Sequence, residues 1–266
     1  MPSTPRLLGF IGIGLVVGFV SGLFGVGGGV LIVPALVLLL RFEHKRATGT
    51  SLIAVAPIAV VGTIAYGAQG YIDWIVSLFL AVGMVGGGVL GSWLLHRLPT
   101  TLITWIFVAV LVAIAIRMCF ADPARGAPNP IDDAGDVVLL LATGLVVGTL
   151  SGLIGVGGGI VIVPTLVVLF GLDDLFAKGA SLVSLVPNAI STSLINLRRR
   201  IGDLPGGLAI GIAGAITVWP GMLLAEWLDP RTASILFAAL LFAIAVQLAV
   251  RTWRRTHPGG PRPGSS

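Results

Sequence analysis

The charged residues of this chain gather at a few places, and eight long segments between them contain none. About 20 apolar residues are enough for a helix to span a bilayer, and each charge-free segment has 19 residues or more. Only helices and closed barrels satisfy their backbone hydrogen bonds in lipid, and these segments do not alternate as barrel strands do. The pattern therefore predicts an all-α integral membrane protein. Its expected spans lie in residues 7–40, 47–72, 74–95, 98–116, 137–172, 179–197, 204–225 and 232–250.

The composition excludes an ordinary soluble enzyme. Charged residues make up 10% of the 266 residues and hydrophobic residues 56%, whereas soluble domains carry about 25% charge. The net charge of +5 is spread between the apolar segments rather than gathered on one face, which argues against a nucleic-acid partner. The one cysteine, Cys119, cannot form a disulfide within the chain. The partner that this composition implies is the lipid bilayer.

The chain consists of two similar halves. Gly14–Leu40 and Gly144–Phe170 are identical at 19 of 27 positions, with an offset of 130 residues. The offset continues to the end of each half, through the pairs Ser51 and Ser181, Pro57 and Pro187, Asp73 and Asp203, and Phe107 and Phe237. Because the first segment recurs within the chain, it belongs to the mature fold and is not a signal peptide.

We therefore predict two homologous halves of four charge-free segments each. A linker rich in Pro, Gly and Asp joins them, and the C-terminal end has the composition of a disordered tail. The expected organisation is a first membrane repeat (1–120), a linker loop (121–136), a second membrane repeat (137–255) and the tail (256–266).

Direct and inverted repeats differ in whether the first segment of each half crosses the membrane or enters and returns. With one crossing, the side of the N-terminus carries 10 Lys and Arg residues against 6 on the other side; with a return, the numbers become 12 against 4. The second arrangement obeys the positive-inside rule better. We therefore expect inverted repeats, a multi-pass protein of the plasma (inner) membrane, and cytoplasmic N- and C-termini.

Each half opens with the sequence GVGGG, at Gly25–Gly29 and Gly155–Gly159. Glycine is the poorest helix former after proline, so four glycines in five residues predict a break in the helix. Eleven residues of Gly14–Leu40 stand on each side of the first motif, and 11 helical residues rise about 16 Å, about half of the hydrocarbon core. The spacing favours two half-helices that meet at a glycine loop. The alternative is one long, tilted helix kinked at the glycines.

The N-terminus of a helix that begins at a break is a favourable place for an anion to bind. The N–H groups at a helix N-terminus carry about +0.5 charge, and glycine lets a ligand approach the backbone closely. Loops from both halves would meet near the membrane midplane, where transporter sites lie. The alternative is that glycines serve only close helix crossings, which is how we interpret Gly83, Gly87 and Gly91, and Gly207 and Gly211. The candidate substrate-binding glycines are Gly25, Gly27, Gly28, Gly29, Gly155, Gly157, Gly158 and Gly159.

Uncharged polar side chains inside the segments complete the candidate binding site. Such donors, with no acid nearby, suit an anion with several oxygens; the alternative is that the hydroxyls bond their own helices. They are Ser21, Ser151, Ser51, Ser181 and Asn188.

No charged residue lies at the centre of a segment, and the three histidines lie at segment ends or in the tail. We therefore expect no catalytic residue, no metal and no cofactor, and an intramembrane enzyme is the rival class of protein. The charged residues of 43–46, and Asp173, Asp174 and Lys178, are expected to solvate helix ends. Alternatively, Lys45 and Arg46 gather anions electrostatically.

The sequences GLVVGFVSGLFGVGGGVLIVP and GLVVGTLSGLIGVGGGIVIVP, each opening one half, resemble the sulfite exporter TauE/SafE family. The members of this family are also known as anion permeases related to toluenesulfonate uptake. The resemblance covers nearly the whole chain, and its glycine motif falls on Gly25–Gly29 and Gly155–Gly159. It implies a plasma-membrane transporter of sulfur-containing anions such as sulfite, sulfonates, sulfoacetate or related organic anions.

Residues and resemblance together lead to one hypothesis: a membrane transporter that exports a small oxyanion by alternating access around the two glycine loops. An anion channel is the alternative. The sequence leaves open which anion is carried, in which direction, with which coupling ion, and whether the chain forms a homodimer.

Overall fold

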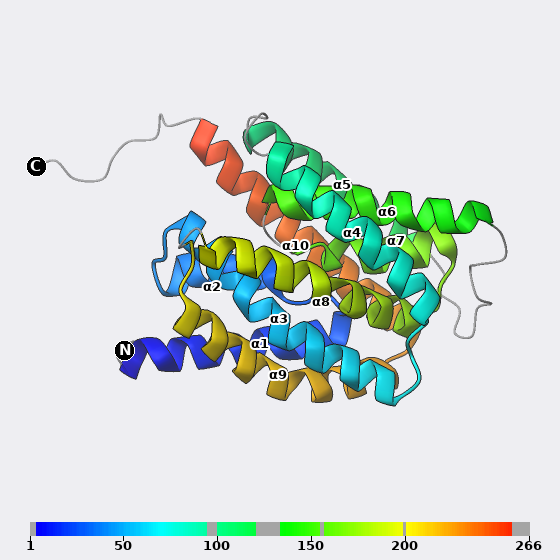
Figure 1. Ribbon diagram of the computed structural model, residues 1–266, viewed down its shortest axis with the longest axis horizontal. Coiled ribbons are helices and arrows are strands. Elements are labelled where there is room, and N and C mark those ends of the chain that lie inside the picture. The colour runs from blue at the N-terminus through cyan, green and yellow to red at the C-terminus, as the bar shows by residue number, and fades with distance from the viewer. Residues whose placement is uncertain (1–3, 95–99, 121–133, 155–156, 199–200, 257–266) are drawn as a thin grey trace, which may run out of the picture.

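The computed structural model describes residues 4–94, 100–120, 134–154, 157–198 and 201–256. Most of the predicted linker (121–133) and of the predicted tail (257–266) therefore lies outside the described residues. Within them every regular element is a helix (Figure 1), so the predicted all-helical fold is confirmed. The helices are α1 (Thr4–Phe24), α2 (Gly29–Leu39), α3 (His44–Ala68), α4 (Trp74–Leu94), α5 (Thr100–Phe120), α6 (Ala134–Ile154), α7 (Gly159–Phe170), α8 (Asp174–Arg198), α9 (Leu204–Trp227) and α10 (Pro230–Thr256).

The described helices make this a multi-pass membrane protein. Seven of them are long and apolar enough to cross a bilayer, namely α1, α3, α4, α6, α8, α9 and α10. The apolar stretch Thr104–Met118 of α5 is shorter, as are α2 and α7. Many large apolar side chains point outward, among them Val16, Ile64 and Ile216; in a membrane these side chains face lipid.

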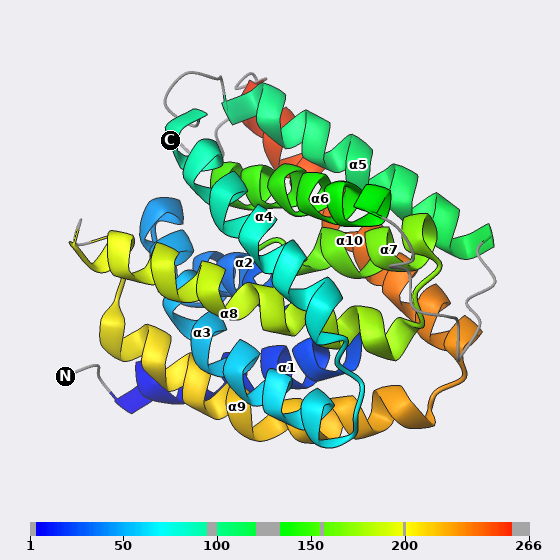
Figure 2. The same cartoon turned by 45° about the vertical axis from the view of Figure 1, so that its right-hand side comes forward.

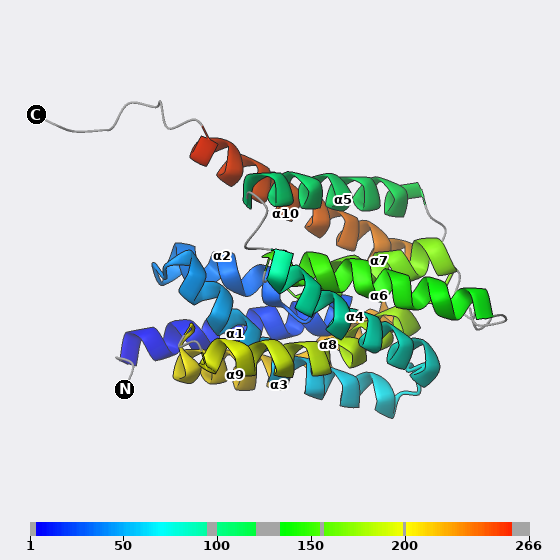
Figure 3. The same ribbon diagram turned by 45° about the horizontal axis from the view of Figure 1, so that its top comes forward.

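The helix boundaries follow the same 130-residue offset as the sequence. Helix α6 begins and ends 130 residues after α1, and α8 begins and ends 130 residues after α3. The halves are not packed separately, because α1 lies along α9 and α4 lies along α6 (Figure 2). Helices α3 and α8 also pack against each other, while α5 and α10 lie together at one side of the bundle (Figure 3).

The predicted helix breaks are present in both halves. Helix α1 ends at Phe24 and α2 begins at Gly29; in the second half α6 ends at Ile154 and α7 begins at Gly159. Helix α2 has 11 residues, as expected of a half-helix, but α1 has 21, because it starts at Thr4. The prediction of two half-helices is therefore correct for α2 and wrong for α1.

The chain reverses direction at the first break. Near the start of α1, a Cβ added to Gly9 would lie 2.9 Å from the Leu40 side chain, which follows α2. The rings of Phe10 and Phe42 are in edge-to-face contact, with centroids 5.9 Å apart. Helix α2 therefore runs back along α1, and the alternative of one long kinked helix is wrong.

Glycine residues spaced along the helices allow close helix crossings. Gly14, Gly18 and Gly22 of α1 press on the backbone of residues 210–218 of α9, where added Cβ atoms would lie 2.0–2.4 Å from carbonyl oxygens. Residue numbers rise together along both helices, so α1 and α9 run in the same direction. Gly207 and Gly211 of α9 pack closely against α3. Residue numbers again rise together along both helices, so α3 and α9 also run in the same direction.

Helices α4 and α6 cross closely in the same way. Added Cβ atoms at Gly83, Gly87 and Gly91 would lie 2.1–2.5 Å from carbonyl oxygens of residues 141–149. Helices α4 and α6 also run in the same direction, since these contacts advance together along both helices. The interpretation of Gly83, Gly87, Gly91, Gly207 and Gly211 as crossing residues is confirmed.

Candidate functional site

The two glycine breaks meet inside the bundle. A Cβ added to Gly159, the first residue of α7, would lie 2.5 Å from the carbonyl oxygen of Val26 in the first break. Leu185 of α8 fills the space beside this junction: its Cδ1 methyl group lies 2.6 Å from the position of a Cβ on Gly27 and 2.8 Å from that of a Cβ on Gly159. Leu185 is fully buried, so the junction is closed by an aliphatic side chain in this conformation.

Left-handed backbone explains why glycine is needed in the breaks. Gly25, Gly27 and Gly28 have φ of 70°, 71° and 77°, and Gly157 has φ of 79°. Residues with a side chain rarely adopt this conformation. Gly158 differs, with φ of −72° in the ordinary helical range. The candidate Gly155 lies outside the described residues.

The helices that leave the breaks begin with unused N–H groups. The carbonyl oxygen of Gly28 accepts hydrogen bonds from the N–H groups of Leu31 and Ile32, and that of Gly158 accepts from Val161 and Ile162. This leaves the N–H groups of Gly29, Val30, Gly159 and Ile160 without a partner among the described residues. Both helices therefore direct backbone donors toward the region of the breaks.

Two of the candidate serines bind the first break directly. The Ser51 hydroxyl of α3 donates to the carbonyl oxygen of Gly29 at 3.2 Å, and the Ser181 hydroxyl of α8 donates to that of Gly25 at 2.8 Å. The alternative that they bond only their own helices is wrong for these two. Because Ser181 comes from the second half, the first break is held by both halves.

The other polar candidates are buried, two of them beside the breaks and Asn188 away from them. Ser21 is fully buried, one turn before Gly25. The carbonyl oxygen of Ser21 accepts a hydrogen bond from the N–H of Gly25. The Ser21 hydroxyl has no hydrogen-bond partner among the described residues. The Ser151 Cβ lies 3.5 Å from the position of a Cβ on Gly158. Asn188 is farther along α8. A Cβ added to Gly88 of α4 would lie 3.0 Å from Asn188 Oδ1.

The charged residues at the start of α8 do not solvate a helix end. Asp173, Asp174 and Lys178 expose 5%, 4% and 3% of their surface, so the expectation of solvated charges is wrong here. Lys178 Nζ lies 2.7 Å from Asp174 Oδ2, and Lys178 Cβ is 2.7 Å from the position that a Cβ on Gly25 would take. A buried ion pair stands directly beside the first break.

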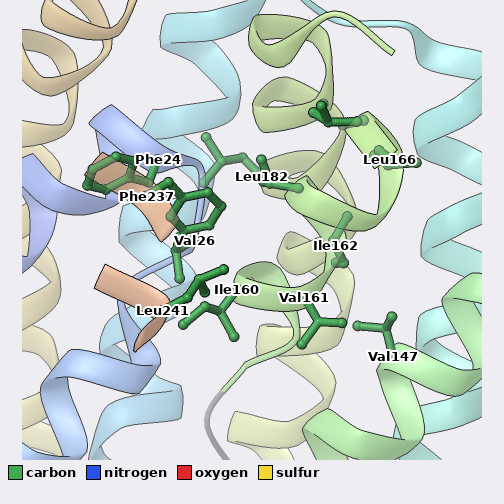
Figure 4. Close-up of a cluster of buried hydrophobic side chains, with 14 of the residues drawn as sticks. Phe24, Val26, Val147, Ile160, Val161, Ile162, Leu166, Leu182, Phe237 and Leu241 are labelled. Atoms are coloured by element: carbon green, nitrogen blue, oxygen red, sulfur yellow. The ribbon is translucent and has the colours of Figure 1, made fainter. Parts of the chain in front are cut away.

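Apart from these groups the junction is apolar. The rings of Phe24 and Phe237 stack with centroids 5.1 Å apart, next to Val26. Figure 4 shows Ile160 and Leu241 on the other side of Val26. In such apolar surroundings the backbone dipoles and the nearby buried charges are little screened by water.

One end of the bundle carries an open cleft. It has a volume of about 480 Å³ and is lined by Glu43, Lys45, Arg46, Ile201 and Gly202. The Arg46 guanidinium lies 3.1 Å from Asp203 Oδ2 and 5.0 Å from the centre of the Phe42 ring. The loop before α3 and the loop before α9 therefore lie at the same end of the molecule.

A protein-family model described as "Sulfite exporter TauE/SafE" matches residues 1–118 and 140–266. This chain belongs to that family. The match includes both glycine breaks, and it makes the protein a membrane transporter of the TauE/SafE family, as the sequence resemblance implied.

Several relatives are named as membrane transporters. The "Probable membrane transporter protein" of Xylella fastidiosa strain 9a5c is 27% identical over 91% of this chain and 95% of its own length. A protein of the same name from Haemophilus influenzae is 27% identical over 89% and 93%. The "Probable membrane transporter protein YunE" of Bacillus subtilis is 36% identical, over 41% of this chain and 40% of its own length. The match to YunE thus spans two-fifths of that relative.

The sequence does not reveal the role of two residues beside the breaks. Lys178 precedes a charge-free segment, so the charge pattern predicts a solvated helix end there, although its spacing of four residues from Asp174 is that of a helical ion pair. Leu185 carries no sequence signal, because an apolar residue in an apolar helix does not reveal which neighbour it contacts.

Proposed function

We propose that this transporter exports small sulfur-containing or organic oxyanions, such as sulfite or sulfonates, by alternating access at the junction of the two glycine breaks. The observation that carries the proposal is the contact of Gly159 with the Val26 carbonyl, which joins the breaks of the two halves. Backbone N–H groups at the starts of α2 and α7 offer donors to an oxyanion. Ser21, Ser151 and Asn188 supply further polar groups, while Ser51 and Ser181 hold the first break through the hydrogen bonds that their hydroxyls donate to its carbonyl oxygens.

Inverted repeats are part of the proposal, and two sets of contacts support them. Helices α1, α3 and α9 share one direction, while α4 and α6 share another. The Arg46–Asp203 contact joins the loops before α3 and α9, which a direct repeat would place on opposite sides of the membrane. At the other end, the Tyr71 hydroxyl donates to Glu226 Oε1 at 2.9 Å, and a direct repeat would separate that pair as well.

Alternating access requires the junction to open toward each side in turn. In the present conformation Leu185 closes it, as expected of an occluded state. Movement of α8 relative to the breaks would withdraw Leu185 and expose the donors. We place the protein in the plasma membrane with both termini in the cytoplasm, following the distribution of Lys and Arg. An anion that leaves a cell with a negative interior gains about 2.3 kcal/mol per charge per 100 mV, which favours export.

The test is sulfite efflux from vesicles that contain the purified protein. Gly158→Leu is the sharper variant, because the φ of −72° at Gly158 accepts a side chain and only bulk is added to the break. Gly28→Leu adds backbone strain as well, since φ is 77° there. Gly12→Leu is the control, because a Cβ at Gly12 meets nothing within 4 Å.

We expect both break variants to lose efflux while Gly12→Leu keeps it. Normal efflux by Gly158→Leu and Gly28→Leu would contradict the proposed site. Rates that rise without saturation, together with ionic currents, would show a channel instead of a carrier.

A further inference from the structure

The buried ion pair of Asp174 and Lys178 lies directly beside the first glycine break. Lys178 Cα and Cβ are each 2.7 Å from the position of a Cβ on Gly25, so the lysine packs flat against the first break. Three residues later on the same face of α8, the Ser181 hydroxyl is bonded to the Gly25 carbonyl. One turn of α8 thus presents a cation and a hydroxyl to the same glycine.

Asp174 is incompletely satisfied. Its Oδ2 accepts from Lys178 Nζ at 2.7 Å, but its buried Oδ1 has no hydrogen-bond partner among the described residues. A charged carboxylate that is removed from water and left with an unpaired oxygen is costly, and apolar residues often replace buried ion pairs without loss of stability. Stability alone therefore gives no reason for this pair.

The pair also breaks the similarity of the halves. At the 130-residue offset, Asp174 corresponds to His44 and Lys178 to Thr48 in α3. The breaks themselves have the same sequence, GVGGG, in both halves, so the ion pair stands on one side of a repeated framework. A single fixed cation beside one break is what a monovalent or divalent anion would use.

We propose that Lys178 is the fixed positive charge that receives the anionic substrate at the first break, and that Asp174 occupies it when no substrate is bound. A sulfite or sulfonate group resembles the aspartate carboxylate, because both present charged oxygens to an ammonium group. The substrate oxygens replace Asp174 Oδ2 at Lys178 Nζ, and no covalent bond changes. The inference rests on the proposed function and adds the residue that selects for negative charge.

The experiment measures labelled sulfite efflux from vesicles as a function of internal sulfite concentration, with wild type, Lys178→Gln, Lys178→Arg and Asp174→Asn. Lys178→Gln should reduce efflux at low sulfite concentration at least tenfold, whereas Lys178→Arg should keep saturable transport. Asp174→Asn should lower the half-saturation concentration, because the substrate no longer competes with a carboxylate. Arg117→Gln, at an exposed cation of α5, should behave as wild type.

Removing one partner of a buried ion pair can unfold a protein, so the double variant Asp174→Asn/Lys178→Gln is measured beside the single ones. It leaves no unpaired charge, and gel filtration and thermal melting report whether it folds. We expect a folded protein with the same loss of efflux as Lys178→Gln. Wild-type efflux by this double variant would overturn the inference and leave the proposed function intact. Absence of anion efflux from wild type would overturn the proposed function and the inference with it.

Discussion

Gly159 packs against the carbonyl oxygen of Val26, 133 positions earlier in the chain, at a distance that leaves no room for a side chain. The first residue of α7 thereby touches the break between α1 and α2. Because Gly159 starts a helix and Val26 lies between two left-handed glycines, both partners are fixed by backbone geometry.

Gly159→Ala should therefore force the two breaks apart. Its Cβ would lie 2.5 Å from the Val26 oxygen and 2.8 Å from Leu185 Cδ1. Overpacking of this kind costs about 1–3 kcal/mol, so we expect a lower melting temperature in detergent and reduced sulfite efflux. Gly12→Ala serves as the matched control and should melt at or above the wild-type temperature. Equal melting temperatures for both variants would contradict the described junction.

The crossing of α4 and α6 can be tested with neighbouring glycines. A Cβ on Gly87 would lie 2.1 Å from the Leu145 carbonyl oxygen, whereas one on Gly86 would reach only Leu145 Cδ1, at an ordinary 3.6 Å. Gly87→Ala should destabilise the protein by about 1–3 kcal/mol, and Gly86→Ala should not. Thermal melting of the two purified variants measures the difference. A stable Gly87→Ala protein would show that the helices do not cross so closely.

The Ser181 hydroxyl should matter more than a hydroxyl that bonds its own helix. Ser181→Ala leaves the buried Gly25 carbonyl without this donor, which costs about 1–3 kcal/mol. Ser191 donates to the carbonyl oxygens of Pro187 and Asn188 in α8, so Ser191→Ala loses only a local bond. We expect lower efflux and a lower melting temperature for Ser181→Ala alone. The idea fails if the two alanine variants cannot be told apart in either measurement.

Leu185→Ala should open the junction between the breaks. Replacing a buried leucine by alanine costs about 2–5 kcal/mol and leaves a space beside Gly27 and Gly159. If Leu185 closes the path, vesicles with this variant should leak sulfite without saturation. A variant that folds and still transports with wild-type saturation would argue that the seal lies elsewhere.

Side-specific labelling tests the inverted topology. In a Cys119→Ser background, single cysteines are placed at the exposed residues Glu43, Arg198, Gln69 and Arg231. An impermeant maleimide added to intact cells should label Gln69→Cys and Arg231→Cys, because inverted repeats place these loops outside. Glu43→Cys and Arg198→Cys should react only after the cells are opened. Labelling of Glu43→Cys in intact cells, with Gln69→Cys protected, is the pattern of a direct repeat.

Much of the helical framework could be predicted from where charges are missing. The breaks at GVGGG could be predicted too, because glycine is unfavourable in helices and no tertiary contact offsets four of them in five residues. The lengths of the helices could not. Helix α1 begins at Thr4, before Arg6, since a long basic side chain at a membrane edge reaches the headgroups without ending the helix.

The prediction of helices from charge-free segments does not detect part of the candidate site. The charge pattern predicts helices in the charge-free segments and helix ends at the charges, but α8 begins at Asp174 and carries Lys178 in its second turn. Pairing at four residues' spacing lets two charges enter a buried helix, which a count of charged residues does not detect. The position of Leu185 depends on how α8 is rotated toward the breaks, and an almost uniformly apolar membrane helix does not encode that rotation in its sequence.

The pairing of α1 with α9 has a consequence for biosynthesis. The glycine stripe at Gly14, Gly18 and Gly22 is synthesised about 200 residues before its partner surface at residues 210–218. Helices α4 and α6 are separated by only about 60 residues along the chain and can pair much sooner. Helix α1 therefore cannot form its crossing with α9 until most of the described helices have been made, whereas α4 and α6 can cross while synthesis continues.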